Sequence, residues 1–192
     1  DTIQTFISET AGADKNRTWP FPFEPQVSVE GNRLKAAFRL ANRQFPNAMA
    51  DSVDLRGMAT TASAGLAGPH SGCVAHVGDS RVYAMDMRNG GTLHQITDDH
   101  SWVEEQVRAG TMTSTAARQH PWRNVVTRAL SGGSDPEIDT VELTPLQGER
   151  LLLCSDGLSG VVAHETIEKL LGDTSATLEE ICDRLVTAAN EG

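Results

Sequence analysis

Three things are scarce in this sequence: aromatic residues, cysteines and long apolar runs. Aromatic side chains make up 5% of the 192 residues, and there are three cysteines. No stretch approaches the roughly 20 consecutive apolar residues that a membrane-spanning helix requires, and no basic segment leads into an apolar run near residue 1. We therefore expect no membrane insertion and a soluble, cytoplasmic protein.

The few cysteines predict reduced thiols rather than a disulfide framework. Cys73, Cys154 and Cys182 show no Cys-x-x-Cys spacing, and two of them lie inside apolar, strand-like runs. Buried reduced thiols suit a reducing compartment. His and Cys do not occur in the clustered spacing of zinc ligands, which argues against a zinc site.

Basic residues are outnumbered by acidic ones. Sixteen Lys and Arg against 26 Asp and Glu give a formal net charge of −10. A surface of this sign disfavours sequence-independent attraction to nucleic acid or anionic lipid, so we expect no nucleic-acid partner. An acidic protein that acts on phosphate needs cations to make its site locally positive.

The sequence does contain short strand-like runs in its middle and amphipathic helical patterns on both sides of them. Helices are predicted for the opening residues, 33–45, 102–110, 114–119, 163–171 and 178–189, and extended segments for 58–66, 73–77, 81–85, 92–96, 124–130, 137–143 and 151–154. The run 151–154 is apolar throughout and predicts a strand covered on both faces. Asn89-Gly90-Gly91 predicts a hairpin turn. This order of elements favours an α+β domain.

Two acidic turns, each at the end of an apolar run, are the strongest chemical signal. Asp79 lies in Val-Gly-Asp-Ser-Arg and Asp156 in Ser-Asp-Gly-Leu. A strand fixes its last residue closely, and carboxylates are hard oxygen donors suited to Mg²⁺ or Mn²⁺. The alternative is that each aspartate only caps a turn or a helix.

Ordered motifs extend this signal over about residues 55–172. Segment 72–83, which contains Val-Gly-Asp-Ser-Arg, resembles a strand pair of the PPM family, the metal-dependent type 2C Ser/Thr protein phosphatases. The motif sequences are similar to those of the bacterial members. Segments 95–101, 120–130 and 152–158 are similar to further motifs of that family in the same order, and Gly57-Met58-Ala59-Thr60-Thr61 is similar to the strand before them.

The resemblance implies a fold, a reaction and a cofactor. The implied fold is a four-layer α/β/β/α sandwich of two mainly antiparallel sheets flanked by helices. The implied reaction is hydrolysis of phosphoserine or phosphothreonine on proteins, with two Mn²⁺ or Mg²⁺ ions, and in bacterial members a third, activating a water. By motif, Asp156 matches a ligand of the metal pair and Asp79 a ligand of the third ion. The implied partners are phosphorylated proteins, substrates of a Ser/Thr kinase, which makes this a signalling enzyme.

Residues 101–124 fall where the family carries a flap, and Asn124 matches a flap position that can reach the third metal. The catalytic acid histidine and the phosphate-binding arginine of the family lie in motifs outside this chain. We therefore interpret His76 as a core histidine and His100 as a residue that caps or orients the flap helix. Arg81 and Arg128 are interpreted as structural pairing residues.

The sequence departs from the family at both ends. The upstream Glu-Asp and Asp-Gly-x-Gly-Gly segments and the downstream Gly-x-Asp-Asn segment, which supply most ligands of the metal pair, are not in residues 1–192. We expect a single, partial phosphatase domain over 1–192. The alternative is a catalytically inactive pseudophosphatase, or a fragment that acts as a regulatory or binding domain; the oligomeric state is open.

Overall fold

The structure, a computed structural model, describes residues 2–12, 16, 18–68, 71–144 and 148–192. The chain divides into two compact units. The first unit falls within residues 1–78 and 100–145, and the second within 79–99 and 146–192. Each unit has its own antiparallel sheet and its own helices.

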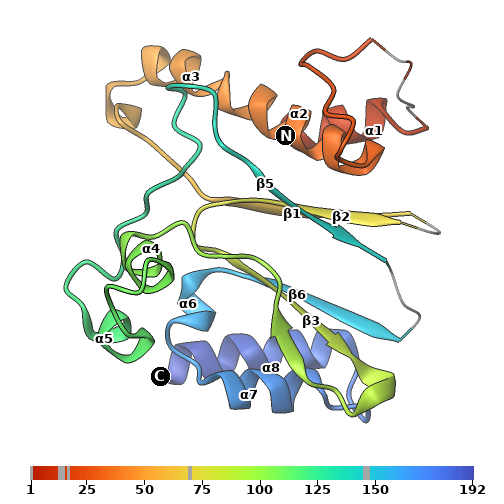
Figure 1. The fold of residues 1–192 in the computed structure, drawn as a ribbon, viewed down its shortest axis with the longest axis vertical. Helices are drawn as coiled ribbons and strands as arrows, with labels where there is room; N and C mark the ends of the chain where they lie inside the picture. The colour runs from red at the N-terminus through yellow and green to blue at the C-terminus, as the bar shows by residue number, and fades with distance from the viewer. Residues whose placement is uncertain (1, 13–15, 17, 69–70, 145–147) are drawn as a thin grey trace. The chain divides into compact units, whose positions relative to one another are not determined.

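The first unit contains a three-stranded sheet with helices α1 and α2 beside it (Figure 1). Its elements are α1 (Thr2–Glu9), α2 (Val29–Asn42), α3 (Phe45–Asp51), the 3₁₀ turn η1 (Val53–Leu55), β1 (Ala62–Ala67), β2 (Gly72–Val77), α4 (Trp102–Arg108), α5 (Ser114–Gln119) and β5 (Asp139–Leu143). The strand order is β1-β2-β5, and both pairs are antiparallel. Strand β2 is buried along its whole length, as the central strand of a covered sheet should be.

Helix α2 covers this sheet because its apolar face and its start signal agree. The side chain of Ser28 caps the helix by accepting a hydrogen bond from the Gly31 amide at 2.9 Å. Leu34 and Phe38, one turn apart, are fully buried and lie in one cluster with residues of β2. The core of this unit consists of Leu34, Phe38, Cys73, Ala75, Val77, Leu130 and Ile138.

Two predicted boundaries in this unit are wrong. The predicted helix 33–45 is two helices, because α2 ends at Asn42 and α3 begins at Phe45 with a proline in its first turn, where the missing amide costs nothing. The predicted strand 58–66 begins only at Ala62. Before β1 begins, Thr60 pairs with Leu130 in an isolated antiparallel bridge that belongs to no named strand.

The second unit places a three-stranded sheet against helices α7 and α8 (Figure 1). Its elements are β3 (Arg81–Asp86), the 3₁₀ turn η2 (Met87–Asn89), β4 (Leu93–Gln95), β6 (Glu149–Cys154), α6 (Asp156–Ser159), α7 (His164–Leu171) and α8 (Leu178–Glu191). The strand order is β4-β3-β6, with antiparallel pairs throughout. The predicted turn between β3 and β4 is confirmed, because Gly90 and Gly91 both have positive φ, at 87° and 66°.

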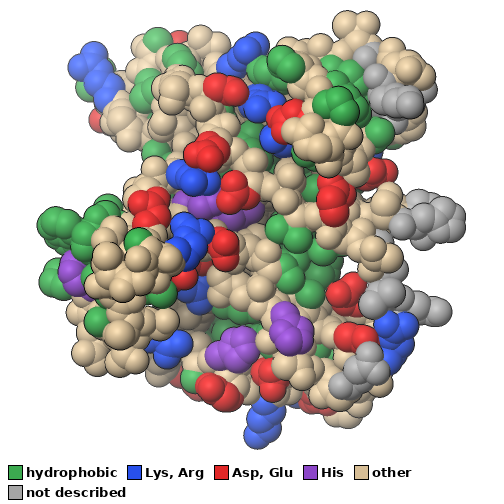
Figure 2. Space-filling model, viewed as in Figure 1, with side chains coloured by type: hydrophobic (Ala, Val, Ile, Leu, Met, Phe, Trp, Pro, Cys, Tyr) green, Lys and Arg blue, Asp and Glu red, His purple; other side chains and the backbone are tan. Residues whose placement is uncertain are grey.

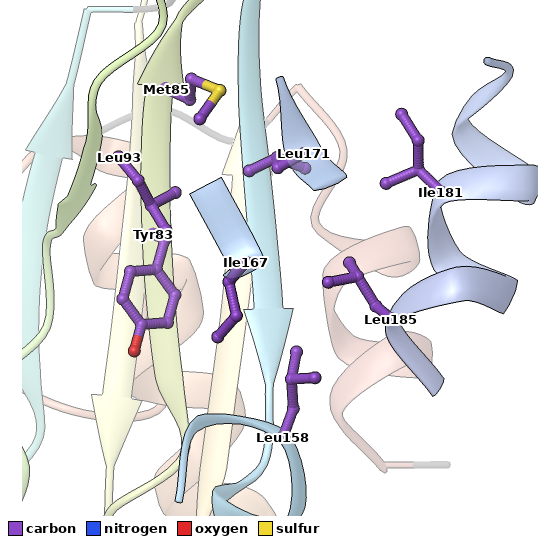
Figure 3. Packing of buried hydrophobic residues seen from close by; sticks show 8 residues of the cluster. All are labelled: Tyr83, Met85, Leu93, Leu158, Ile167, Leu171, Ile181 and Leu185. Atoms are coloured by element: carbon purple, nitrogen blue, oxygen red, sulfur yellow. The ribbon is translucent and has the colours of Figure 1, made fainter. Parts of the chain in front are cut away.

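The core of the second unit joins all of these elements. Figure 3 shows its buried side chains converging from β3, β4, α6, α7 and α8: Tyr83, Met85, Leu93, Leu158, Ile167, Leu171, Ile181 and Leu185. Helix α8 begins with a reciprocal capping box, in which Thr177 and Glu180 each accept a hydrogen bond from the other's backbone amide. Its apolar stripe then faces the sheet.

The prediction that the run 151–154 is covered on both faces is wrong. Leu152 and Cys154 pack against the core, whereas Leu151 and Leu153 are 40% and 44% exposed. Strand β6 is at the edge of the sheet order, and an antiparallel sheet can bury one face only. The pattern of the run did not reveal this because both faces carry leucine.

The expected fold class is confirmed. The described residues form two antiparallel sheets flanked by helices, which is an α+β arrangement. The expectation of one domain over residues 1–192 with a flap over 101–124 stays a prediction. None of the helices in the described part of the chain combines the length and the hydropathy needed to span a bilayer.

Helix α8 offers a matched test of this packing. Leu185 is 3% exposed within the core cluster, and Leu178, on the same helix, is 62% exposed. Leu185→Ala is expected to lower the free energy of unfolding by about 2–5 kcal/mol, because it leaves a cavity. Leu178→Ala is expected to change it by less than about 0.5 kcal/mol. Urea unfolding followed by circular dichroism measures both, and equal effects would contradict the assigned buried face.

Candidate metal-binding site

Asp79 and Asp156 stand at one end of a single strand pair. Arg81, the first residue of β3, is paired with Cys154, the last residue of β6. Asp79 lies two residues before Arg81, and Asp156 lies two residues after Cys154. Because the pair is antiparallel, both aspartates follow the same end of it, Asp79 in the turn before β3 and Asp156 at the start of α6.

The electrostatics show that the two carboxylates interact. Asp79 is half-buried, and Asp156 is exposed as the first residue of α6. Burial raises the pKa of Asp79 above its ordinary value, and the negative charge of Asp156 raises it further. Two like charges close to each other therefore stand at the end of the sheet, in a place that favours a bound cation.

Arg81 lowers the pKa of Asp79 only in part, because burial and the charges of Asp156 and Asp99 outweigh it, and its guanidinium is paired with Asp99. Its Nε and Nη2 atoms donate to Asp99 in a fork, with the shortest distance 2.6 Å from Nη2 to Oδ2. Burial opposes the charge of Arg81, but the bonds to Asp99 outweigh it and hold the Arg81 pKa above its usual range. The interpretation of Arg81 as a structural pairing residue is confirmed.

The donor chemistry fits a hard divalent cation. Asp79 and Asp156 offer carboxylate oxygens, which Mn²⁺ and Mg²⁺ prefer. Over the described residues, no group of three or more His, Cys, Asp or Glu side chains gathers as a metal cluster. The chain therefore supplies part of a coordination shell, and the metal-binding role of both aspartates stays a prediction.

The two histidines and Arg128 make structural contacts within the first unit. His76 is 1% exposed and its Nδ1 lies 2.8 Å from the hydroxyl of Ser63, which confirms it as a satisfied core histidine. Arg128 pairs with Asp139 at 3.3 Å and with Glu137 at 3.4 Å, which confirms structural pairing. Of the two roles expected for His100, capping the helix is wrong, because Ser101 caps α4 and His100 bonds to Gly78 and Asp139. Orienting the flap helix stays a prediction.

The predicted flap segment contains α4 and α5, with an aromatic cluster beside them. The rings of Trp102, His120 and Trp122 lie within 6 Å of one another, at 4.9 to 5.9 Å between centroids. Asn124 is exposed, and its role as a ligand of a third metal stays a prediction. Figure 2 shows acidic and basic side chains interspersed over the face it presents, rather than one continuous acidic surface.

Comparison with known proteins points to one family. A model of the protein phosphatase 2C family matches residues 16–189. The serine/threonine phosphatase stp of Listeria welshimeri is 35% identical over 157 residues, 82% of this chain and 61% of that protein. The solved structure of the Mycobacterium tuberculosis serine/threonine phosphatase PstP/Ppp matches with a TM-score of 0.78 at 34% identity, covering 98% of this chain and 74% of that one.

A second solved structure bears on the metal. The catalytic domain of PstP in complex with two manganese ions matches with a TM-score of 0.72 at 31% identity, over 98% of this chain and 73% of that one. The present chain spans about three fifths of the length of the Listeria relatives. It therefore resembles a large part of these proteins and not the whole.

Because the pKa of Asp79 is raised, we expect the metal-free protein to lose stability as the pH rises. A carboxyl group with a raised pKa in the folded state binds its proton more tightly there, so stability is lost as the pH rises from about 4 through that raised pKa. Asp79→Asn removes the charge and is expected to raise the thermal midpoint at pH 7 in EDTA, with the gain disappearing at about pH 3.

Thermal unfolding across this pH range, with Asp183→Asn on the exposed side of α8 as the control, measures the effect. No gain at pH 7 from Asp79→Asn would show that the two charges do not repel each other.

Proposed function

This chain belongs to the protein phosphatase 2C family, and we propose that the protein containing it is a metal-dependent phosphatase that hydrolyses phosphoserine and phosphothreonine on proteins. The observation that carries the proposal is the interaction between Asp79 and Asp156 at the end of β3 and β6. The manganese complex of a related catalytic domain supports the choice of Mn²⁺ or Mg²⁺ as the cofactor.

In this proposal Asp79 and Asp156 are cation ligands, and the ends of the strands fix their positions. Asp156 is set by the end of β6 and the start of α6, and Asp79 by the turn into β3. Bound Mn²⁺ or Mg²⁺ would supply activation of water and neutralisation of phosphate charge. Asp79 and Asp156 would contribute oxygen ligands for two ions or three, and Asn124 is the flap candidate for the third.

Other polar groups near the site have a supporting part. The Arg81–Asp99 fork fixes the start of β3 two residues from Asp79, with Gln95 donating a further hydrogen bond to Asp99 at 3.2 Å. The Cys154 thiol lies next to the acidic turn, but burial raises its pKa, which leaves it protonated and a poor nucleophile. This supports attack by water over a covalent cysteine mechanism.

The alternative is an inactive binding module, and the electrostatics argue against it. Two interacting carboxylates, one of them half-buried, reduce the stability of the metal-free protein at neutral pH. Functional sites often contain ionisable groups with shifted pKa values that lower the stability of the folded protein. A module without metal chemistry would be more stable with a neutral residue at position 79.

The substrates and location follow from the same proposal. The Listeria and Mycobacterium relatives are named serine/threonine phosphatases, and we propose phosphoproteins made by a Ser/Thr kinase as the substrates here. The three cysteines are free, and burial raises the pKa of Cys73 to about 12. Free thiols suit the cytoplasm, where a bacterial signalling phosphatase of this kind would act.

The direct test is hydrolysis of an aryl phosphate and a phosphothreonine peptide by the full-length protein. Activity is expected only with added Mn²⁺ or Mg²⁺ and is expected to disappear in EDTA. Asp156→Asn is expected to lower the rate by more than about 100-fold, because the loss of a direct ligand exceeds the loss of an outer-shell partner.

Asp183→Asn provides the matched control, since it makes the same charge change on the exposed side of α8. It is expected to leave the rate unchanged. Full activity in EDTA, or full activity of Asp156→Asn, would overturn the metal mechanism. Tight binding of a phosphoprotein by the Asp156→Asn variant with no turnover by either form would favour the binding module.

A further inference from the structure

His100 is buried, and each of its polar groups forms a hydrogen bond. Two of these groups, the ring Nδ1 and the backbone amide, bond to the same residue, Gly78. The ring is 1% exposed. Its Nδ1 accepts a hydrogen bond from the Gly78 amide at 3.0 Å, while its own backbone amide donates to the Gly78 carbonyl at 2.8 Å. The His100 carbonyl accepts from the Thr127 amide at 2.8 Å, and Nε2 lies 2.9 Å from Oδ2 of Asp139.

These contacts fix which ring nitrogen carries the proton. An amide N–H can only donate, so Nδ1 of His100 must be the unprotonated acceptor, and Nε2 carries the proton toward Asp139. Asp139 is held in turn by Arg128 at 3.3 Å. The face of the His100 ring packs against His76, with the ring centroids 4.8 Å apart. The ring is therefore locked in orientation and in tautomer.

The backbone conformation of Gly78 is one that only glycine fits, and it is restrained by these hydrogen bonds to His100. Its φ is +116°, and a Cβ there would lie 2.3 Å from Cγ2 of Thr61. No other residue type fits this position without displacing Thr61, and glycine alone gives little resistance to rotation of its own backbone. His100 replaces the missing restraint by gripping both the amide and the carbonyl of Gly78.

The grip matters for Asp79 because the Gly78 carbonyl belongs to the peptide unit that also contains the Asp79 nitrogen and Cα. That unit is planar, so holding the carbonyl oxygen sets the direction in which the chain enters Asp79. We propose that His100 is a positioning residue for Asp79: by clamping Gly78 from both sides, it aims the aspartate at the cation. The proposal rests on the proposed function for its metal, but the clamp itself is testable without metal.

Two substitutions of His100 distinguish its Nδ1 contact with Gly78 from its Nε2 contact with Asp139. The amide oxygen of asparagine lies near the place of Nδ1, so His100→Asn keeps an acceptor for the Gly78 amide and loses the contact with Asp139. The amide nitrogen of glutamine lies near the place of Nε2, so His100→Gln keeps the contact with Asp139 and loses the acceptor for Gly78.

The first measurement uses amide hydrogen exchange of ¹⁵N-glycine-labelled full-length protein in EDTA. The Gly78 amide is expected to exchange faster in His100→Gln and to stay protected in His100→Asn. A through-bond coupling between the Gly78 nitrogen and Nδ1 of His100 in the unsubstituted protein gives the same answer if His100→Gln does not fold. Unchanged exchange in His100→Gln, or no such coupling, would overturn the clamp.

The second measurement is Mn²⁺ binding, followed by the paramagnetic resonance signal of the free ion. The dissociation constant is expected to rise about 10–100-fold in His100→Gln, as for other outer-shell partners of metal ligands. It is expected to stay near the unsubstituted value in His100→Asn, whereas KM for an aryl phosphate changes little in either. Equal Mn²⁺ affinity in His100→Gln and the unsubstituted protein would overturn the positioning role. Absence of Mn²⁺ binding by the unsubstituted protein would instead contradict the proposed function, and the exchange result would still decide the clamp.

Discussion

The repulsion between Asp79 and Asp156 is the constraint on which the rest of the site depends. The two aspartates follow from one antiparallel pairing, with Arg81 opposite Cys154. Folding of the second unit therefore brings two carboxylates together whether or not a cation is present. The packed core under β3 and β6 holds the pair in place, and a bound cation would turn the repulsion into attraction.

The nearest basic residue in the sequence compensates the pair only in part. Arg81 lies two residues from Asp79 and lowers its pKa, but the net shift is still upward. The guanidinium of Arg81 is paired with Asp99, whose own negative charge acts on Asp79 in the opposite direction. His100 accepts a hydrogen bond from the Gly78 amide through Nδ1, which fixes the tautomer of its ring. Both arrangements leave the carboxylates available to a divalent ion.

Much of the fold and the position of the two acidic turns could be predicted from the sequence, because they depend on local patterns. The faces of α2 and α8, the glycine turn before β4 and the two acidic turns are all set by residues within a few positions of one another. The errors arose where local patterns are ambiguous. The helix predicted over 33–45 took no account of Pro46, although proline is well suited to the first turn of a new helix, and the run of leucines did not show which face of β6 is exposed.

The supporting contacts could not be predicted, because their partners are far apart in the chain. The Gly78 amide and His100 are 22 residues apart, and Arg81 and Asp99 are 18 residues apart. The pair Asp99-His100 suggested a helix start, and no local signal shows that both side chains instead turn back to the strand ends around Asp79. The hydrogen bonds of the structure show it, from the Gly78 amide to His100 and from Arg81 to Asp99.

The most direct test of the central claim uses the paramagnetism of Mn²⁺, which broadens the NMR signals of nuclei close to the ion. The account predicts that substoichiometric Mn²⁺ added to the ¹⁵N-labelled full-length protein broadens the amide signals on both sides of Asp79 and of Asp156 at the same metal concentration. Broadening near only one of these aspartates, or at neither, would contradict the claim that they hold metal together.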